Sequence, residues 1–286
     1  MDRIAPTVTK AEPFEFESDG LRLAGERFPA GDRGIVLLLH GGGQTRHSWS
    51  RTGLRLSQRG WTAIALDARG HGDSQWAPDR DYSLQAFVND LLTFIATLGE
   101  PPVLVGASLG GTTSLVAAGE HRGLARGLVL VDIVAKLEQA GTDRIRGFMT
   151  AHPEGFASLD EVAEAIEAYN PVRKRRRNLD GLKKNVRLGD DGRWRWHWDP
   201  AFMAIGDEPQ RFADPKRVEA AAAALTIPTM VVRGAHSDVV SDEGLAHMLA
   251  LVPHAQVVEV GAAAHMVAGD DNDVFATRLG AFLDSL

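Results

Sequence analysis

The chain has 286 residues, 44% of them hydrophobic and 24% charged, and a formal net charge of −7 at pH 7. These proportions are ordinary for a globular protein, and the acidic balance argues against nucleic acid as the main partner. The absence of cysteine excludes disulfides and thiolate metal sites. No apolar run approaches the roughly 18 residues that span a bilayer, and the first residues lack a secretory pattern. We therefore expect a cytoplasmic protein that does not act at a membrane.

Strands and helices are predicted to alternate along the first 132 residues. Apolar and polar residues alternate on both sides of Ser18-Asp19-Gly20, which predicts an antiparallel hairpin at a sheet edge. Ser83 precedes apolar residues at helical spacing and is a suitable N-cap for a helix over 83–98. Further predictions are a helix near 47–59 and strands at 35–39, 62–66, 102–105 and 127–131. This order implies an α/β fold with a mostly parallel sheet and helices on both faces.

A serine lies at a sharp turn between a predicted strand and a predicted helix. The turn reads Gly106-Ala107-Ser108-Leu109-Gly110. A hydroxyl at this position is lifted off the end of the sheet and faces the positive end of the following helix. The flanking glycines permit close backbone approach and a strained turn. Ser108 is therefore the candidate nucleophile, with a simple helix cap as the alternative interpretation.

Three further segments at the ends of predicted strands carry chemically suitable groups. His40-Gly41-Gly42-Gly43 follows the strand at 35–39, and its backbone N–H groups suit a developing oxyanion, where one donor contributes about 3 to 4 kcal/mol. A plain flexible loop is the alternative. Asp238 follows a strand at 229–234, and His265 follows a strand at 256–260. The order serine, aspartate, histidine suits a nucleophile that is activated by a base and an orienting acid.

These segments, together with Asp67-Ala68-Arg69-Gly70-His71-Gly72-Asp73-Ser74, resemble the α/β-hydrolase superfamily over nearly the whole chain. The resemblance implies Ser108 as nucleophile and His265 as general base. It implies Asp238 as the acid, because the position after the penultimate strand is the usual one, and Asp132 as the alternative that some relatives use. It also implies an oxyanion hole formed by the backbone N–H groups of Gly42 and Leu109.

The strand–helix pattern breaks after Asp132. From about 133 to 215 the chain is helical and charged, and the apolar strands resume near 227. Many members of the superfamily carry a helical cap here, so we predict a core of residues 1–132 and 216–286 and a cap of residues 133–215.

The predicted cap contains two unusual segments. Trp194, Trp196 and Trp198 alternate along the chain, which places the three indoles on one side of an extended segment. They would pack the cap onto the core or line an apolar substrate pocket. The basic run within 173–187 would form a solvated face or steer an anionic substrate toward the site.

The predicted activity is serine-dependent hydrolysis of a small-molecule ester or lactone through an acyl-enzyme. Serine in place of aspartate at the turn argues against epoxide hydrolase or haloalkane dehalogenase chemistry. One alternative is hydrolysis of an amide or a carbon–carbon bond in a small anionic catabolic intermediate, and another is a binding module of the same fold without turnover. No His/Asp/Glu cluster has the spacing of a metal site, so neither metal nor cofactor is expected. The oligomeric state is left open.

Overall fold

The computed structural model of the chain describes residues 11–169, 179–204, 213–261 and 273–286. In chain order the elements are β1 (Glu12–Ser18), β2 (Leu21–Phe28), β3 (Ile35–Leu39), the 3-10 helix η1 (Arg46–Trp49), α1 (Ser50–Gln58), β4 (Thr62–Leu66), α2 (Leu84–Ala96), β5 (Val103–Ala107), α3 (Leu109–Glu120), β6 (Gly127–Val131), α4 (Gln139–Thr150), α5 (Leu159–Tyr169), the 3-10 helix η2 (Asp180–Lys184), β7 (Val186–Leu188), β8 (Trp194–Trp196), α6 (Pro200–Ala204), α7 (Pro215–Ala223), β9 (Thr229–Gly234), α8 (Asp242–Leu251), β10 (Gln256–Val260) and α9 (Asp273–Asp284). Among these helices, none is both long enough and apolar enough to cross a bilayer.

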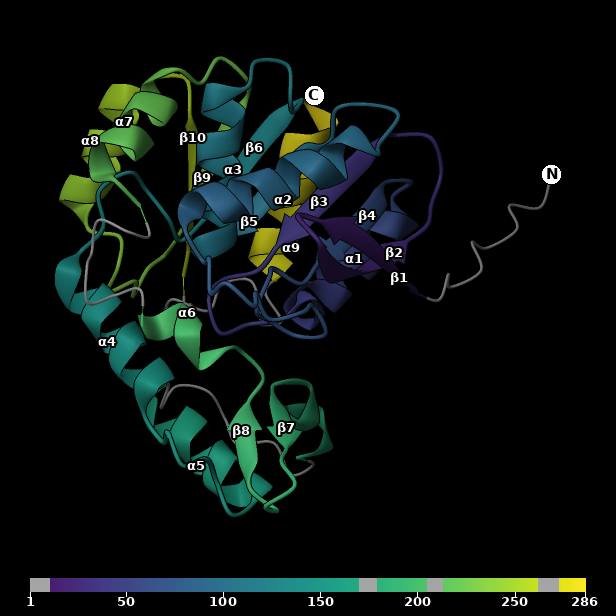
Figure 1. The fold of residues 1–286 in the computed structure, drawn as a ribbon. Coiled ribbons are helices and arrows are strands. Elements are labelled where there is room, and N and C mark those ends of the chain that lie inside the picture. Colours follow the sequence, from purple (N-terminus) through teal and green to yellow (C-terminus); the bar gives the residue numbers. More distant parts are fainter. Residues whose placement is uncertain (1–10, 170–178, 205–212, 262–272) are drawn as a thin grey trace.

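The described strands form a mostly parallel sheet in the order β1-β2-β4-β3-β5-β6-β9-β10 (Figure 1). β1 and β2 form the predicted antiparallel hairpin, and β2 also pairs antiparallel with β4, whereas the other neighbours are parallel. Parallel strands need crossover connections, and the helices between them supply these. The predicted α/β architecture is therefore confirmed.

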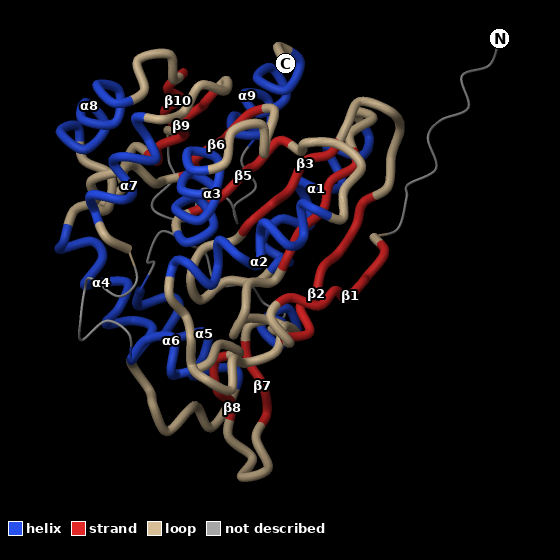
Figure 2. The backbone as a smooth tube through the Cα atoms, turned by 45° about the horizontal axis from the view of Figure 1, so that its top comes forward, coloured by secondary structure: helices blue, strands red, loops and turns tan. Residues whose placement is uncertain are grey.

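Helices cover both faces of the sheet because side chains alternate along each strand. In β3, Leu37 belongs to a core cluster that includes residues of α2, α3, α7 and α8, while Val36 and Leu38 belong to the cluster of the opposite face, which includes residues of α1 and α9. Figure 2 shows α2 and α3 crossing one face. All three side chains are fully buried, and burial of such a side chain contributes roughly 1.5 to 3 kcal/mol. This two-sided core fixes the strand ends that carry the site.

After β6, the elements α4, α5, β7 and β8 form a smaller lobe, with α6 between this lobe and the sheet, whereas α7 packs against α3 in the core (Figure 1). Helices were predicted here, but the lobe also contains the antiparallel β7–β8 hairpin, in which Val186 pairs with Trp196. Phe156, Val162 and Val186 form its small apolar core. The strands are too short for a sequence pattern to distinguish them from loops.

Candidate active site

Ser108 lies where β5 turns sharply into α3. Its backbone adopts φ 43° and ψ −110°, a conformation that L-residues rarely occupy. Such strain costs about 1 to 3 kcal/mol and persists only where the surroundings enforce it. Here the Ser108 N–H donates to the Val131 carbonyl at 3.2 Å, and the Thr112 N–H donates to the Ser108 carbonyl at 2.8 Å. The turn therefore holds a partly exposed hydroxyl at the N-terminus of a helix.

Two glycines make this turn possible by their lack of a side chain. A Cβ on Gly106 would lie 2.4 Å from the Gly110 carbonyl oxygen, and a Cβ on Gly110 would lie 2.5 Å from the Leu39 carbonyl oxygen. Both distances are shorter than any tolerated contact with rigid backbone. The glycines predicted to allow close approach are thus required, and they bring the elbow against the end of β3.

The loop after β3 runs beside the serine. A Cβ on Gly41 would lie 3.3 Å from the Ser108 Cβ. His40 Nδ1 donates to the Gly41 carbonyl at 2.8 Å, and the Gln44 N–H donates to the same oxygen at 3.1 Å. Because a trans peptide points its C=O and N–H in opposite directions, the Gly42 N–H is directed away from His40.

Two backbone donors in this region lack an acceptor among the residues that the structure describes. Within the described ranges, neither the Gly42 N–H nor the Leu109 N–H makes a hydrogen bond. The Leu109 N–H is one of the donors that a helix N-terminus leaves unsatisfied. By contrast, the Gly41 N–H is held by the Gln44 side-chain oxygen at 3.1 Å. Gln44 was not singled out from the sequence, because a side chain that braces its own loop has no distinctive spacing.

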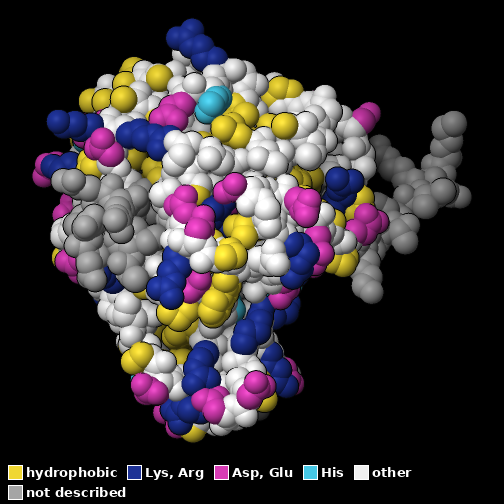
Figure 3. Space-filling model, in the orientation of Figure 1, with side chains coloured by type: hydrophobic (Ala, Val, Ile, Leu, Met, Phe, Trp, Pro, Cys, Tyr) yellow, Lys and Arg dark blue, Asp and Glu magenta, His cyan; other side chains and the backbone are white. Residues whose placement is uncertain are grey.

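Apolar side chains from α4, from α6 and from the segment between β8 and α6 lie against this loop. A Cβ on Gly42 would lie 3.4 Å from Phe202, and a Cβ on Gly43 would lie 3.0 Å from Met149 and 3.4 Å from Trp198. Figure 3 shows hydrophobic side chains gathered where the lower lobe meets the larger body. The wall beside the glycine loop is therefore apolar and aromatic.

The structure places the two candidate acids in different surroundings. Asp132 follows β6, is 2% exposed and has φ 53°. Its carboxylate accepts hydrogen bonds from the Gly234 N–H at 3.3 Å and from the Ser237 hydroxyl at 3.0 Å. Ser237 Oγ in turn accepts the Val240 N–H at 3.0 Å. Asp132 is thus a buried, oriented carboxylate at the carboxyl edge of the sheet, next to the elbow strand.

Asp238 instead pairs with the smaller lobe. Its carboxylate accepts a hydrogen bond from Arg144 of α4 at 2.7 Å, and its side chain is 32% exposed. The same guanidinium donates to the Tyr169 carbonyl at 2.6 Å. A Cβ on Gly141 would lie 2.2 Å from the Asp238 carbonyl oxygen, so α4 packs tightly here. Asp238 therefore connects the β9 loop to α4. The predicted base, His265, lies outside the described residues.

Three buried histidines form a row beside the glycine loop. The ring centroids of His40 and His71 are 5.3 Å apart, and those of His71 and His197 are 5.9 Å apart. His40 Nε2 accepts the Ala68 N–H at 3.0 Å while Nδ1 donates, so this imidazole is neutral. His71 Nδ1 donates to the Arg69 carbonyl at 3.0 Å, and in the described structure its Nε2 has no partner.

The pKa of each of these histidines is lowered, mainly because burial disfavours the charged form. For His71 the pKa falls to about 3, and the proximity of His40 adds to the effect. For His197, burial lowers the pKa most, and electrostatic interactions with His71, His40 and Arg187 lower it further. For His40 the nearby Asp67 opposes the shift and Arg46 adds to it, yet burial dominates and the pKa is lowered.

Acidification is therefore expected to destabilise the fold. The folded-state pKa values lie below the unfolded value of about 6.5, so the unfolded chain binds more protons below that pH. Each neutral buried histidine therefore contributes fully to the free energy of unfolding above about pH 6.5. As the pH falls toward the pKa of the folded state, this contribution decreases by up to about 1.4 kcal/mol per pH unit for each histidine. Urea unfolding at pH 7.5, 6.5 and 5.5 measures this slope. His71→Asn should reduce the slope, whereas the exposed control His121→Gln should not; equal slopes in all three proteins would contradict the assignment.

The other predicted segments have structural contacts. The loop from Asp67 to Ser74 is held by hydrogen bonds from the Arg46 N–H and the Asp73 N–H to the Asp67 carboxylate at 2.6 and 3.0 Å. In the basic run, Arg187 donates to Asp73 at 2.8 Å and Lys183 to Asp180 at 2.9 Å. Residues 173–177 lie outside the described ranges.

The three tryptophans do not share one environment. Trp194 and Trp196 pack against the small apolar core of the lobe. Trp198 is 4% exposed and stacks on Trp196 with ring centroids 4.9 Å apart and planes at 12°. As described above, Trp198 is also the one that reaches Gly43. Packing therefore accounts for the first two indoles, and the third lies at the boundary with the glycine loop.

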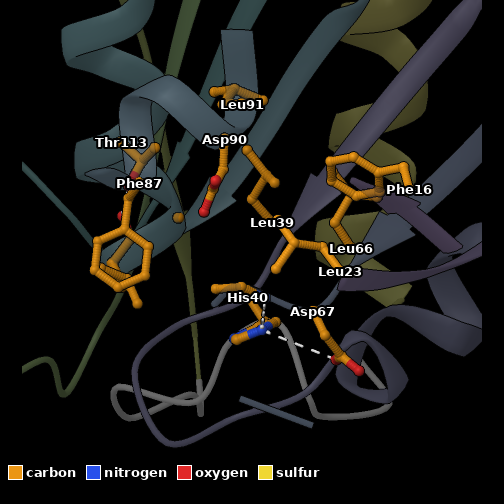
Figure 4. Close-up of a pocket in the computed structure, with 13 residues that line it drawn as sticks. Phe16, Leu23, Leu39, His40, Leu66, Asp67, Phe87, Asp90, Leu91 and Thr113 are labelled. Atoms are coloured by element: carbon orange, nitrogen blue, oxygen red, sulfur yellow. Dashed lines mark hydrogen bonds and ion pairs between the residues drawn. The ribbon is translucent and has the colours of Figure 1, made fainter. Parts of the chain in front are cut away.

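Figure 4 shows the residues that line a cavity of about 40 Å³. Its wall includes Phe16, Leu23 and Phe87, together with Leu109, and Ser108 is not part of it. Asp90 borders the cavity, but its carboxylate binds Arg69 through two hydrogen bonds at 2.7 and 2.8 Å. Among the described residues no group of three or more potential ligands could hold a metal ion.

Comparison with known proteins agrees with this architecture. The family model described as alpha/beta hydrolase fold matches residues 34–271. An esterase of Mycobacterium tuberculosis, Rv0045c, is 33% identical over 235 residues, which cover 79% of this chain and 74% of that protein. The 2-(acetamidomethylene)succinate hydrolase of Mesorhizobium japonicum is 29% identical over 255 residues, covering 88% of each chain.

Solved structures give the same result. The crystal structure of E-2-(acetamidomethylene)succinate hydrolase superposes with a TM-score of 0.83 at 26% identity, covering 96% of this chain and 100% of that one. These relatives are an esterase and a 2-(acetamidomethylene)succinate hydrolase, and the similarity extends over most of this chain. The protein is a hydrolase, and its chain belongs to the alpha/beta hydrolase fold family.

Proposed function

We propose that this protein is a serine hydrolase that cleaves a small-molecule ester or lactone through an acyl-enzyme on Ser108. The observation that carries the proposal is the strained elbow. It presents a hydroxyl at the start of α3 beside two backbone donors, Gly42 N–H and Leu109 N–H, that have no acceptor within the described structure. Strain of this kind is concentrated at functional sites.

The proposed reaction has two steps. Ser108 Oγ transfers its proton to His265 and attacks the carbonyl carbon, and the negative oxygen accepts hydrogen bonds from Gly42 and Leu109. His265 then protonates the leaving alcohol. Water, activated by the same histidine, releases the acid and regenerates the serine.

Of the two candidate acids, we propose Asp132. Its burial and its hydrogen bonds from Gly234 and Ser237 support a carboxylate that is fixed in one orientation. The ion pair of Asp238 with Arg144 supports a different role for that residue, in holding α4 against the β9 loop.

We also propose that residues 133–215 act as a cap that shapes the substrate pocket. Met149, Trp198 and Phe202 lie against Gly42 and Gly43, which supports contact between these side chains and an apolar acyl or alkyl group. For Trp194 and Trp196 a place in the substrate pocket has less support, because both side chains pack within the cap.

A second candidate is hydrolysis of an amide in a small anionic compound. It is favoured by the similarity to 2-(acetamidomethylene)succinate hydrolase, which covers most of both chains. The same nucleophile would serve both reactions, so the difference lies in the leaving group.

A substrate panel tests the proposed function. Short p-nitrophenyl esters, lactones, amides of dicarboxylic acids and β-diketones are incubated with the wild-type protein, and product is followed by absorbance and mass spectrometry. We expect the highest kcat/KM for esters with short acyl chains. Faster turnover of the anionic amides would support the second candidate, and turnover of none of them would indicate a binding module.

A further inference from the structure

One imidazole of the cap bridges two loops of the core. His197 follows β8 and is 1% exposed. Its Nδ1 accepts the Gly72 N–H at 2.7 Å, and its Nε2 lies 3.3 Å from the Gly43 carbonyl oxygen. Because Nδ1 accepts, the proton of the neutral ring is on Nε2, which donates to Gly43. The His197 backbone is itself fixed, since its N–H donates to the Asn185 carbonyl at 3.1 Å.

The Gly43 carbonyl belongs to the loop that carries the proposed oxyanion donor. Gly43 has φ +72°, and this loop has few side chains of its own to restrict it. The Gly41 carbonyl is held by His40 and the Gly41 N–H by Gln44, both from the core. On the other side of Gly42, the contact from His197 holds the Gly43 carbonyl. The Gly42 N–H thus lies between two contacts from the core, on Gly41, and one contact from the cap, on Gly43.

We propose that His197 is a positioning residue for the oxyanion loop, so that the cap sets the direction of the Gly42 N–H. This inference rests on the proposed function, because it assigns a catalytic use to that N–H. An oxyanion donor acts only if it already points at the developing charge, and loss of one donor lowers kcat about 10²–10³-fold. Partial misalignment after loss of the His197 contact should therefore lower kcat about 10-fold.

An experiment can distinguish positioning of the glycine loop from mere docking of the cap, because the segment after β8 is also held to the core through Asp199. The Asp199 N–H donates to the Gly70 carbonyl at 2.9 Å, and the Tyr82 hydroxyl donates to the Asp199 carboxylate at 2.5 Å. These contacts keep the segment docked when His197 is replaced. They do not touch the glycine loop, so Tyr82→Phe is a matched control for cap docking alone.

Two substitutions distinguish the two hydrogen bonds of His197. In His197→Asn the amide oxygen lies where Nδ1 lay and accepts from Gly72, but no donor reaches Gly43. In His197→Gln the amide nitrogen reaches the position of Nε2 and donates to Gly43, while the bond from Gly72 is lost. We expect kcat for a short p-nitrophenyl ester to fall about 10-fold in His197→Asn, with KM within about 2-fold of wild type. In His197→Gln and in Tyr82→Phe, kcat should stay within about 3-fold of wild type.

The outcomes are separable. Equal kcat in His197→Asn and wild type, equal losses in the Asn and Gln variants, or a change in KM alone would overturn the inference while leaving the proposed function in place. Circular dichroism and thermal unfolding show whether the variants fold. If neither His197 variant folds, the role of His197 is structural and the inference is overturned as well. Absence of Ser108-dependent ester hydrolysis in the wild-type protein would remove the proposed function and the inference together.

Discussion

Ser108→Ala is expected to abolish ester hydrolysis, with kcat for p-nitrophenyl acetate reduced by roughly 10⁴-fold or more. The physical reason is that alanine has no hydroxyl to form the acyl-enzyme, so only uncatalysed attack by water next to the oxyanion donors remains. Initial rates under saturating substrate, with the wild-type protein purified in parallel, measure the effect.

The fold should be unaffected by this change. Serine and alanine both carry a Cβ, so the strained backbone at φ 43° is no worse in the variant. The Ser108 backbone hydrogen bonds to Val131 and Thr112 also remain. Similar thermal unfolding with full retention of activity would contradict the nucleophile assignment.

Asp132→Asn is expected to lower kcat about 10³-fold or more, because an amide no longer stabilises the charged imidazolium and holds the wrong histidine tautomer. Asp238→Asn is expected to change kcat by less than about 5-fold, since it removes a partly exposed ion pair with Arg144. The two substitutions are isosteric and therefore control for each other. Steady-state kinetics of both variants on one ester gives the comparison.

The reverse order of losses would assign the acid to Asp238. Small and equal losses would show that neither carboxylate orients the base. Thermal unfolding of both variants is needed alongside the kinetics, because the Asp132 carboxylate is buried and accepts hydrogen bonds from Gly234 and Ser237.

Much of the core was predictable from the sequence because its signals are local. Apolar runs with helical segments between them indicated the parallel sheet, and Ser83 indicated the start of α2, where its side chain accepts the Ala86 N–H. The elbow was predictable because Gly106 is imposed by its close contact with the Gly110 backbone, within one turn of the chain. Such constraints operate over a few residues and leave a readable pattern.

The parts that were not predictable depend on contacts between distant segments. The ion pair of Asp238 is one example, because its partner Arg144 belongs to a helix that lies 94 residues earlier in the chain. The contact between His197 and Gly43 spans 154 residues. The β7–β8 hairpin forms from three-residue strands whose pairing is stabilised by the surrounding cap. No periodicity encodes these partners.

The most direct test of the central claim is a map of the covalent adduct. The wild-type protein is treated with a fluorophosphonate and digested, and the modified peptide is identified by mass spectrometry. The account predicts one phosphonate on Ser108. The labelled fraction should rise in parallel with the loss of esterase activity, and Ser108→Ala should not be labelled. Labelling of another residue, or inactivation without any modification of Ser108, would contradict it.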